Sequence, residues 1–436
     1  MKPTRACKTL LVALGTLALV LGLADGALAQ NNEEIFQQFQ WNFFPPGARA
    51  SAMGQAFIGI ADDASAAVTN PAGLMSLTRP QVYIEFKNTQ LKNERLASAG
   101  SLTTLQPTVF STDVRSFSFF NVAAPIGGRV AVAFTRHEYL NYEEQFELEP
   151  RPSPTGVAGR YLAPAAADVD FTGTTYAGSV AVAVTDRFRV GLTVSANQLE
   201  AVARQTRYRI AAVGGAVVSN GIILNESTLD ESATAPAWSL GAVFRPVDQF
   251  ALGLLYAKGP KFSVTETQSV NPSSSQNGTL QVNAVEELAI NTPDRFGIGI
   301  SARPQSRLLV AFDAVRIQYS QLAEDILPGP FLTGDEFAID DATEIHFGGE
   351  VLAVTGANPV FVRAGVLTNP YHGMKYLGGS PDAATNAIWD GIFKPGNQDD
   401  KVHGTVGFGV AVGRRLQVDL GYVWNRDLVV SGAVRF

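Results

Sequence analysis

The sequence predicts an all-β fold: an antiparallel transmembrane β-barrel of about fourteen strands with an N-terminal hatch, or plug, in its lumen. Apolar and polar residues alternate in segment after segment, the connections alternate between short turns and long loops, and the chain begins with an export signal. Of the 436 residues, 46% are hydrophobic and 17% are charged, whereas soluble domains have roughly 25% charged residues. This composition excludes a disordered chain.

Residues 1–29 have the layout of a signal peptide. Lys2, Arg5 and Lys8 precede an apolar run at residues 10–23, and Ala-Leu-Ala at 27–29 provides the small residues that signal peptidase recognises. The run is shorter than the roughly 20 residues needed to span a bilayer, which disfavours the alternative of an uncleaved anchor. We therefore expect the mature chain to begin at Gln30.

Cleavage would also change the chemistry open to the chain. It removes three basic residues and Asp25, so the net charge goes from −7 to −9, and it removes Cys7, the only cysteine. A mature chain without cysteine has no disulfide, no thiolate nucleophile and no cysteine-ligated metal. The acidic balance gives no electrostatic reason to expect nucleic acid as a partner.

Alternation with a period of two residues predicts the strands. In residues 401–413, apolar side chains such as Val406 and Phe408 alternate with polar or small ones such as Thr405. The strands of a soluble β-sandwich would alternate in the same way. The predicted strands are residues 81–93, 114–124, 129–142, 168–184, 188–203, 234–245, 250–264, 294–303, 307–318, 343–354, 360–371, 401–413, 416–425 and 427–436.

The connections distinguish a barrel from a sandwich. Tight turns at residues 125–128, 185–187, 246–249 and 304–306 are interleaved with long loops at 148–167, 211–233, 268–293, 322–342 and 372–400. Short turns on one rim and long loops on the other are typical of outer-membrane barrels. Residues 278–290 fit either a strand or a loop.

A barrel of this kind implies a location and partners. The chain ends on Phe436, as the last strand of many such barrels ends on an aromatic residue. We expect a multi-pass protein of the outer membrane of a Gram-negative-type bacterium, with outer-membrane lipid and the barrel assembly machinery as partners.

Residues 30–80 lack sustained alternation and are predicted to form the hatch. After Pro45-Pro46 the segment is rich in small residues, which suggests short helices and turns. A barrel of about fourteen strands is wider than one whose lumen side chains can fill, so it needs additional content. The predicted organisation is a signal peptide at 1–29, the hatch at 30–80 and the barrel at 81–436.

The hatch residues resemble a known family. Gly47-Ala48-Arg49-Ala50, Gly54-Gln55-Ala56-Phe57, Ala61-Asp62-Asp63-Ala64-Ser65 and Asn70-Pro71-Ala72-Gly73 are similar to the N-terminal hatch of the FadL/TodX long-chain fatty acid and hydrocarbon transporters. Thr292-Pro293-Asp294-Arg295 adds to the resemblance. The outer-membrane shuttle proteins of type IX secretion carry a similar stretch, so a shuttle or adaptor barrel of a protein-secretion system is the alternative function.

The FadL/TodX resemblance implies an uptake channel for hydrophobic compounds, fatty acids or hydrocarbons. The outer loops would capture the compound, a lumenal pocket would hold it, and it would leave sideways through the wall after the hatch moves. The resemblance also implies an inward kink in the strand between Arg129 and Tyr142, facing Asn70. The hatch and gating residues would be Gly54, Asp62, Asp63, Asn70, Pro71 and Ala72.

Two further groups are candidates for substrate contact. Arg363 alternates with Val362 and Ala364 and is expected to face the lumen, where it would either brace a charge network or contact ligand. An apolar stretch in the third long loop would capture substrate at the surface or pack over the barrel mouth. Its residues are Val213, Ile222, Ile223 and Leu224.

No catalytic, metal or cofactor site is predicted. Asp62 and Asp63 are adjacent and point in different directions on most backbones, which favours turn hydrogen bonds over a metal site. The four histidines have no metal-ligand spacing. An outer-membrane lipase or deacylase would need an activated Ser-His pair, which the sequence does not exclude. The prediction is therefore a transporter without cofactor, not an enzyme.

Overall fold

The computed structural model describes residues 41, 43–98, 105–152, 161–213, 216–273, 276–323, 337–379, 383, 386, 390, 400–413 and 415–436. The predicted signal peptide and the first residues of the predicted hatch lie outside this range. Among the described residues, no helix is long and apolar enough to cross a membrane.

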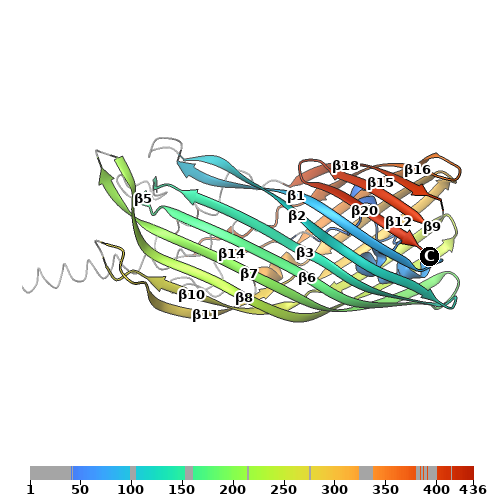
Figure 1. Ribbon diagram of the computed structural model, residues 1–436, viewed down its shortest axis with the longest axis horizontal. Coiled ribbons are helices and arrows are strands. Elements are labelled where there is room, and N and C mark those ends of the chain that lie inside the picture. The colour runs from blue at the N-terminus through green and yellow to red at the C-terminus, as the bar shows by residue number, and fades with distance from the viewer. Residues whose placement is uncertain are drawn as a thin grey trace, which may run out of the picture.

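The described part of the chain forms a closed antiparallel barrel of fourteen strands, as predicted (Figure 1). Pairing of β8 with β9 closes the ring, and the first ring strand pairs with the last. The ring strands are β1 (Gln81–Ser98), β2 (Leu105–Ile126), β3 (Val130–Leu148), β6 (Ala165–Ala183), β7 (Phe188–Val213), β8 (Ala216–Val247), β9 (Phe250–Lys258), β12 (Arg295–Gln305), β13 (Leu308–Ile317), β15 (Ala342–Val354), β16 (Val360–Asn369), β18 (Lys401–Val412), β19 (Leu416–Val423) and β20 (Asp427–Arg435).

One rim of the barrel, here called the short-turn end, carries connections of two to five residues, such as those between β6 and β7 and between β8 and β9. At the other rim two predicted loops are wrong. Residues 211–233 belong largely to β7 and β8, which extend far beyond the ring as a hairpin. Residues 268–293 hold most of the hairpin of β10 (Lys261–Val270) and β11 (Gln281–Asn291), so residues 278–290 are mainly strand.

The remaining short elements complete the described chain. Two small strand pairs lie outside the main sheet, and the helices are one turn or little more. They are β4 (Arg151–Pro152) with β5 (Tyr161–Leu162), β14 (Phe337–Ala338) with β17 (Lys375–Tyr376), the α-helices α3 (Ala48–Ala52) and α4 (Ala66–Thr69), and the 3₁₀ helices η2 (Pro71–Ser76) and η3 (Tyr319–Ala323).

The barrel is turned inside out relative to a soluble protein. On β18 the large apolar side chains, Val402, Val406 and Phe408, are exposed, while Thr405 and Ala411 are buried. A soluble sandwich would bury the apolar face, so the outward apolar face supports a barrel whose solvent is lipid. The helices of the N-terminal segment lie within the barrel, toward the end that holds the C-terminus (Figure 1).

Candidate functional site

Close backbone contacts hold the N-terminal segment, residues 43–80, against the inner face of the wall. Gly54 has a φ of +61°, and a Cβ there would lie 2.4 Å from the Phe347 carbonyl oxygen. Its N–H donates to Thr405 Oγ1 at 3.0 Å. On β13, next to the strand that carries Phe347, Asp313 Oδ2 accepts hydrogen bonds from the N–H groups of Phe57, at 2.6 Å, and Ile58, at 2.7 Å.

Asn70 ties the turn before η2 to the wall. Its Oδ1 accepts from the N–H of Ala72 at 3.3 Å, and its Nδ2 donates to the carbonyls of Ile58, at 3.1 Å, and Ala242 of β8, at 3.2 Å. Gly241 makes this approach possible, because a Cβ there would lie 2.1 Å from Asn70 Oδ1. Asn70 therefore bonds both its own turn and the barrel.

Pro71 and Ala72 lie against β7, where a Cβ on Gly191 would lie 2.4 Å from the Ala72 nitrogen. The sequence predicts the close turn at these residues but gives no sign of the two wall glycines that receive it.

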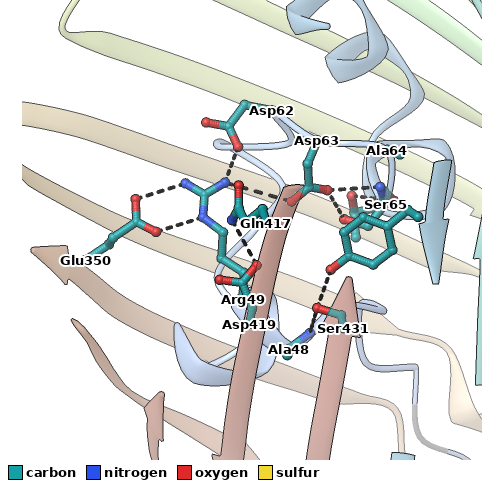
Figure 2. Close-up of polar contacts among 12 residues, drawn as sticks. Ala48, Arg49, Asp62, Asp63, Ala64, Ser65, Glu350, Gln417, Asp419 and Ser431 are labelled. Carbon is teal, nitrogen blue, oxygen red and sulfur yellow. Dashed lines mark hydrogen bonds and ion pairs between the residues drawn. The ribbon is translucent and has the colours of Figure 1, made fainter. Parts of the chain in front are cut away.

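A buried charge network joins the segment to the wall (Figure 2). Arg49 donates to both oxygens of Glu350, at 2.8 and 3.1 Å, and also bonds Asp62. Asp63 accepts from the Ser65 N–H at 2.9 Å and from the Ser65 hydroxyl at 2.6 Å. The predicted turn bonds of this carboxylate are confirmed.

Ionisation in the network is set by burial and by its partners. Burial raises the pKa of Asp63 above its usual value, and the negative charge of Asp62 adds to the effect although Arg49 opposes it. Burial alone would lower the pKa of Arg49, but Asp62 and Glu350 hold it above its ordinary value.

Arg363 faces the lumen but has no free charge to offer a ligand. Its guanidinium donates to Glu350 at 2.7 Å and to Asp419 at 2.6 Å, and the residue is 2% exposed. These contacts favour the bracing interpretation of Arg363 over ligand contact. Among the described residues, no group of three or more metal-ligating side chains is present.

A cavity, here called the main cavity, is lined by residues such as Leu91 of β1 and Tyr142 of β3, about ten residues along these strands from the short-turn end. It therefore lies on the side of the N-terminal segment away from that end. Apolar side chains contribute much of its lining, including Phe43, Phe44, Val68 and Leu140, together with the basic residue Lys87. The lining also includes charged side chains, among them Glu138, Lys258 and Arg295, so the cavity offers apolar surface beside polar and charged groups.

Two arginines contact the first aromatic residues of the N-terminal segment, which line this cavity. Arg295 lies over the Phe43 ring, with 4.5 Å from its guanidinium carbon to the ring centroid, and Arg426 lies over Phe44 at 3.9 Å. Trp41 stacks on Tyr139 with ring centroids 5.9 Å apart and an interplanar angle of 11°. Cation–π and stacking contacts of this kind fix the aromatic rings in orientation as well as position.

The barrel wall is interrupted next to this cavity. In the described chain, pairing between β2 and β3 ends at Phe119 and His137, whereas β3 continues to pair with β6 as far as Leu148. A register shift between Glu138 and Leu140 marks a bulge at Tyr139, which packs inward over Gly173. We call the unpaired stretch of β2 and β3 beyond Phe119 and His137 the wall split.

A bulge lies within the stretch where the inward kink is predicted, between Arg129 and Tyr142, but it does not face Asn70 as predicted. Asn70 contacts β8, whereas the bulge lies on β3. η2 packs mainly against β6, β7 and β8 and less against β2 and β3. Its Asn-Pro end lies against Gly191 of β7 and Gly241 of β8, which are not strands of the split.

The apolar stretch predicted to capture substrate lies far from the cavity lining. Val213 is 63% exposed at the tip of the β7–β8 hairpin, and Ile223 pairs with Tyr208 within it. Ile222 and Leu224 flank Ile223 on the same hairpin, and none of these residues lines the main cavity. Their role in capture stays a prediction.

A family comparison identifies this architecture. The model of the family described as outer membrane protein transport protein (OMPP1/FadL/TodX) matches residues 43–339. The chain belongs to the OMPP1/FadL/TodX family. Members are outer-membrane transport proteins rather than enzymes.

Solved structures share the fold of this FadL/TodX-family protein at low sequence identity. A Pseudomonas aeruginosa FadL homologue is 15% identical, with a TM-score of 0.59, and the match covers 90% of this chain and 99% of that one. The Pseudomonas putida toluene transporter TodX is 13% identical, with a TM-score of 0.60, over 91% and 99% of the two chains. The Ralstonia pickettii toluene transporter TbuX is 14% identical, with a TM-score of 0.56, over 91% and 99%. No curated protein sequence matches the chain.

Sequence reasoning missed the residues that shape the cavity of this family member. Tyr139, Arg295 and Arg426 come from three different parts of the chain, and no local pattern brings them together. The one usable signal was the alternation of inward and outward residues along a strand, which places Arg295 on the inner face and Phe296 on the outer face. Burying a charged side chain costs free energy unless it is paired, so an inward arginine is expected to contact another group in the lumen.

Proposed function

We propose that this FadL/TodX-family protein carries apolar compounds, such as fatty acids or hydrocarbons, across the outer membrane, holds them in the main cavity and releases them sideways through the wall split. The observation that carries the proposal is that the cavity reaches the split. Val114 and Ser116 of β2 line it from one side, and Leu140 and Tyr142 of β3 line it from the other.

The wall is expected to open there because it lacks a hydrogen-bonded ladder. A fully paired barrel has no lateral exit, since separating two strands would expose backbone groups to lipid. Beyond Phe119 and His137 that cost is already absent between β2 and β3. An acyl chain gains about 0.8 kcal/mol per methylene on leaving water, so binding in the cavity needs no covalent step.

In this proposal the N-terminal segment acts as the hatch. Gly54, Asp62, Asp63, Asn70, Pro71 and Ala72 hold it in the closed position through the contacts described above. The cavity and the short-turn end lie on opposite sides of the segment, so passage straight through the barrel would require it to move. The short-turn end would face the periplasm, as in other outer-membrane barrels.

Crosslinking across the split tests the lateral route. The expected mature chain has no cysteine, so Phe117→Cys with Glu138→Cys provides the only thiols for a short bis-maleimide. Bridging them should block uptake of a hydrophobic substrate while the barrel still shows heat-modifiable migration on gels. The matched control is Val122→Cys with Phe134→Cys, which are direct cross-strand partners below the split. Uptake that persists with the Phe117–Glu138 bridge formed would refute the lateral route.

A further inference from the structure

A second polar site lies at the short-turn end, on the side of the N-terminal segment away from the cavity. Arg189 of β7 and Arg245 of β8 both donate to the hydroxyl oxygen of Ser76, the last residue of η2. The distances are 2.9 Å from Arg189 Nη1 and 3.1 Å from Arg245 Nη2. Two guanidinium groups therefore converge on one neutral oxygen.

The convergence is imposed by the barrel. Arg189 pairs with Val243 on the neighbouring strand, and Arg245 is two residues farther on, so the two side chains are diagonal neighbours on one face of the sheet. Like charges in this relation repel each other. Among the described residues, neither arginine has a carboxylate within ion-pair distance.

Local structure does not account for this arrangement. Basic side chains near the end of a helix often bind its last carbonyl groups. Here both guanidinium groups bond the Ser76 side chain instead. A serine hydroxyl accepts two hydrogen bonds and donates one. Because both acceptor positions are occupied by arginine, the hydroxyl proton is left to donate to a third group.

The surroundings are open and carry both signs of charge, with arginines in excess of the exposed carboxylates Asp186 and Asp248. Ser76 and Arg245 line a hollow at the short-turn end, together with Asp62, Asp248 and Arg303. Asp62 is engaged by Arg303 at 3.4 Å and by Arg49. Exposed arginines on the adjoining turns are Arg129, Arg187, Arg307 and Arg415. Such a field raises the local concentration of anions.

We propose that Arg189, Arg245 and Ser76 form an oxyanion site that binds a carboxylate or phosphate group at the short-turn end. The oxyanion would accept from both guanidinium groups and from the Ser76 hydroxyl, and it would neutralise the two like charges. Guanidinium geometry matches carboxylate and phosphate oxygens in this way. The group would belong to an amphiphilic solute or to an anionic phospholipid of the adjoining leaflet. The site does not depend on the lateral route.

Thermal unfolding of the full-length mature protein in non-ionic detergent tests the site, with inorganic phosphate as the probe and chloride at equal ionic strength as the reference. A ligand that binds the folded state raises the transition temperature with its concentration. We expect a saturable phosphate-specific rise for the wild type and for Arg307→Gln, an exposed arginine of another turn at the same end. The rise should be lost in Arg189→Gln/Arg245→Gln.

Single variants keep the test decisive if the double variant fails to assemble. Arg189→Gln should weaken phosphate binding at least about tenfold, the factor for one charge-assisted hydrogen bond. Octanoate that competes with phosphate would identify a solute carboxylate as the ligand. Phosphatidylglycerol retained by the wild type, but not by Arg189→Gln, in native mass spectrometry would identify a lipid headgroup. No phosphate-specific rise in the wild type, or an equal rise in Arg189→Gln, would overturn the proposal.

Discussion

Arg136 of β3 donates a hydrogen bond from its guanidinium to the carbonyl oxygen of Phe117 on β2, at the level where the two strands part. The same guanidinium lies over the Phe117 ring, 5.8 Å from its centroid, and pairs with Glu138 at 3.5 Å. A side chain thus satisfies a backbone group that the interrupted ladder leaves without a strand partner. Arg136 therefore links the two strands at the point where the wall split begins.

Replacing Arg136 should lengthen the split. Arg136→Met removes the bond to Phe117 and leaves its carbonyl unsatisfied, at a cost of about 1–3 kcal/mol. We expect faster amide hydrogen exchange near Phe119 and His137, the last paired residues, and unchanged exchange near Ala123 and Ala133.

The matched control for this variant is Arg316→Met. Arg316 is an exposed arginine of β13 that bonds Thr343, where the β13–β15 ladder is continuous. It should leave exchange at its strand pair unchanged. Equal protection in Arg136→Met and wild type would show that the split is fixed by the backbone alone.

Asn70→Ala should loosen the N-terminal segment without preventing barrel assembly. The variant loses the donor to Ile58 and Ala242 and the acceptor for Ala72, in a residue with no solvent exposure. We expect docking of the segment to weaken by about 1–3 kcal/mol, seen as faster proteolysis of residues 43–80, and we expect reduced uptake of a hydrophobic substrate.

Gly241→Ala provides an independent test of the same contact from the wall. Its new methyl group would overlap Asn70 Oδ1, so it should reproduce the effect of Asn70→Ala with the asparagine intact. Unchanged proteolysis and uptake in both variants would show that the Asn70 turn does not hold the segment.

The strands were predictable because each carries its own signal. Alternation places Val406 and Phe408 on one face, and short turns such as residues 185–187 fix the side of the membrane on which each strand begins. The strand ends at the rim opposite the short-turn end were not predictable. Residues 225–232 are nearly all polar, although Asn225 and Ser227 are buried. Without apolar residues at the buried positions there is no hydrophobic alternation, so the sequence predicts a loop at residues 211–233 where the structure has strand.

The candidate site was predictable only in its local part. The Asn70-Pro71 pair predicts a bend, and Asp63 predicts hydrogen bonds within a turn, because both features depend on residues that are neighbours in sequence. The partners across the lumen did not follow from the sequence. Gly241 and Asp313 meet the segment through the closure of the ring, which brings residues more than 150 positions apart into contact.

Asp63→Asn should reveal the cost of a buried carboxylate. The pKa of Asp63 is raised in the folded protein by burial and then by Asp62, so the folded state binds its proton more tightly than the unfolded state does. Ionisation of Asp63 therefore opposes folding above its folded pKa, and the opposition disappears as the pH falls below the unfolded value of about 3.9.

We expect Asp63→Asn to be at least as stable as the wild type at pH 7, with the difference shrinking toward pH 4. Thermal unfolding of both proteins at several pH values measures it. Asp62→Asn is the control, because Asp62 engages both Arg49 and Arg303 and should lose stability at pH 7. A wild type more stable than Asp63→Asn at pH 7 would mean that the contact with Arg49 outweighs burial.

Tyr139 should control how firmly an apolar ligand stays in the cavity. Its ring lines the cavity at the bulge, stacks on Trp41 and packs over Gly173, whereas its hydroxyl has no hydrogen-bond partner among the described residues. We therefore expect the ring, and not the hydroxyl, to contribute to ligand binding. Tyr139→Ala removes apolar surface worth about 1.5–3 kcal/mol, so binding should weaken by roughly ten- to a hundredfold and release should accelerate.

Tyr139→Phe separates the ring from the hydroxyl. It keeps the stacking surface and removes only the oxygen, so its affinity for 1-N-phenylnaphthylamine, a fluorescent apolar probe, should match that of the wild type. Stopped-flow displacement of the probe gives the release rate. If Tyr139→Phe loses affinity as Tyr139→Ala does, the hydroxyl contacts the ligand. If Tyr139→Ala binds and releases the probe as the wild type does, the ligand leaves by a path that does not pass the bulge.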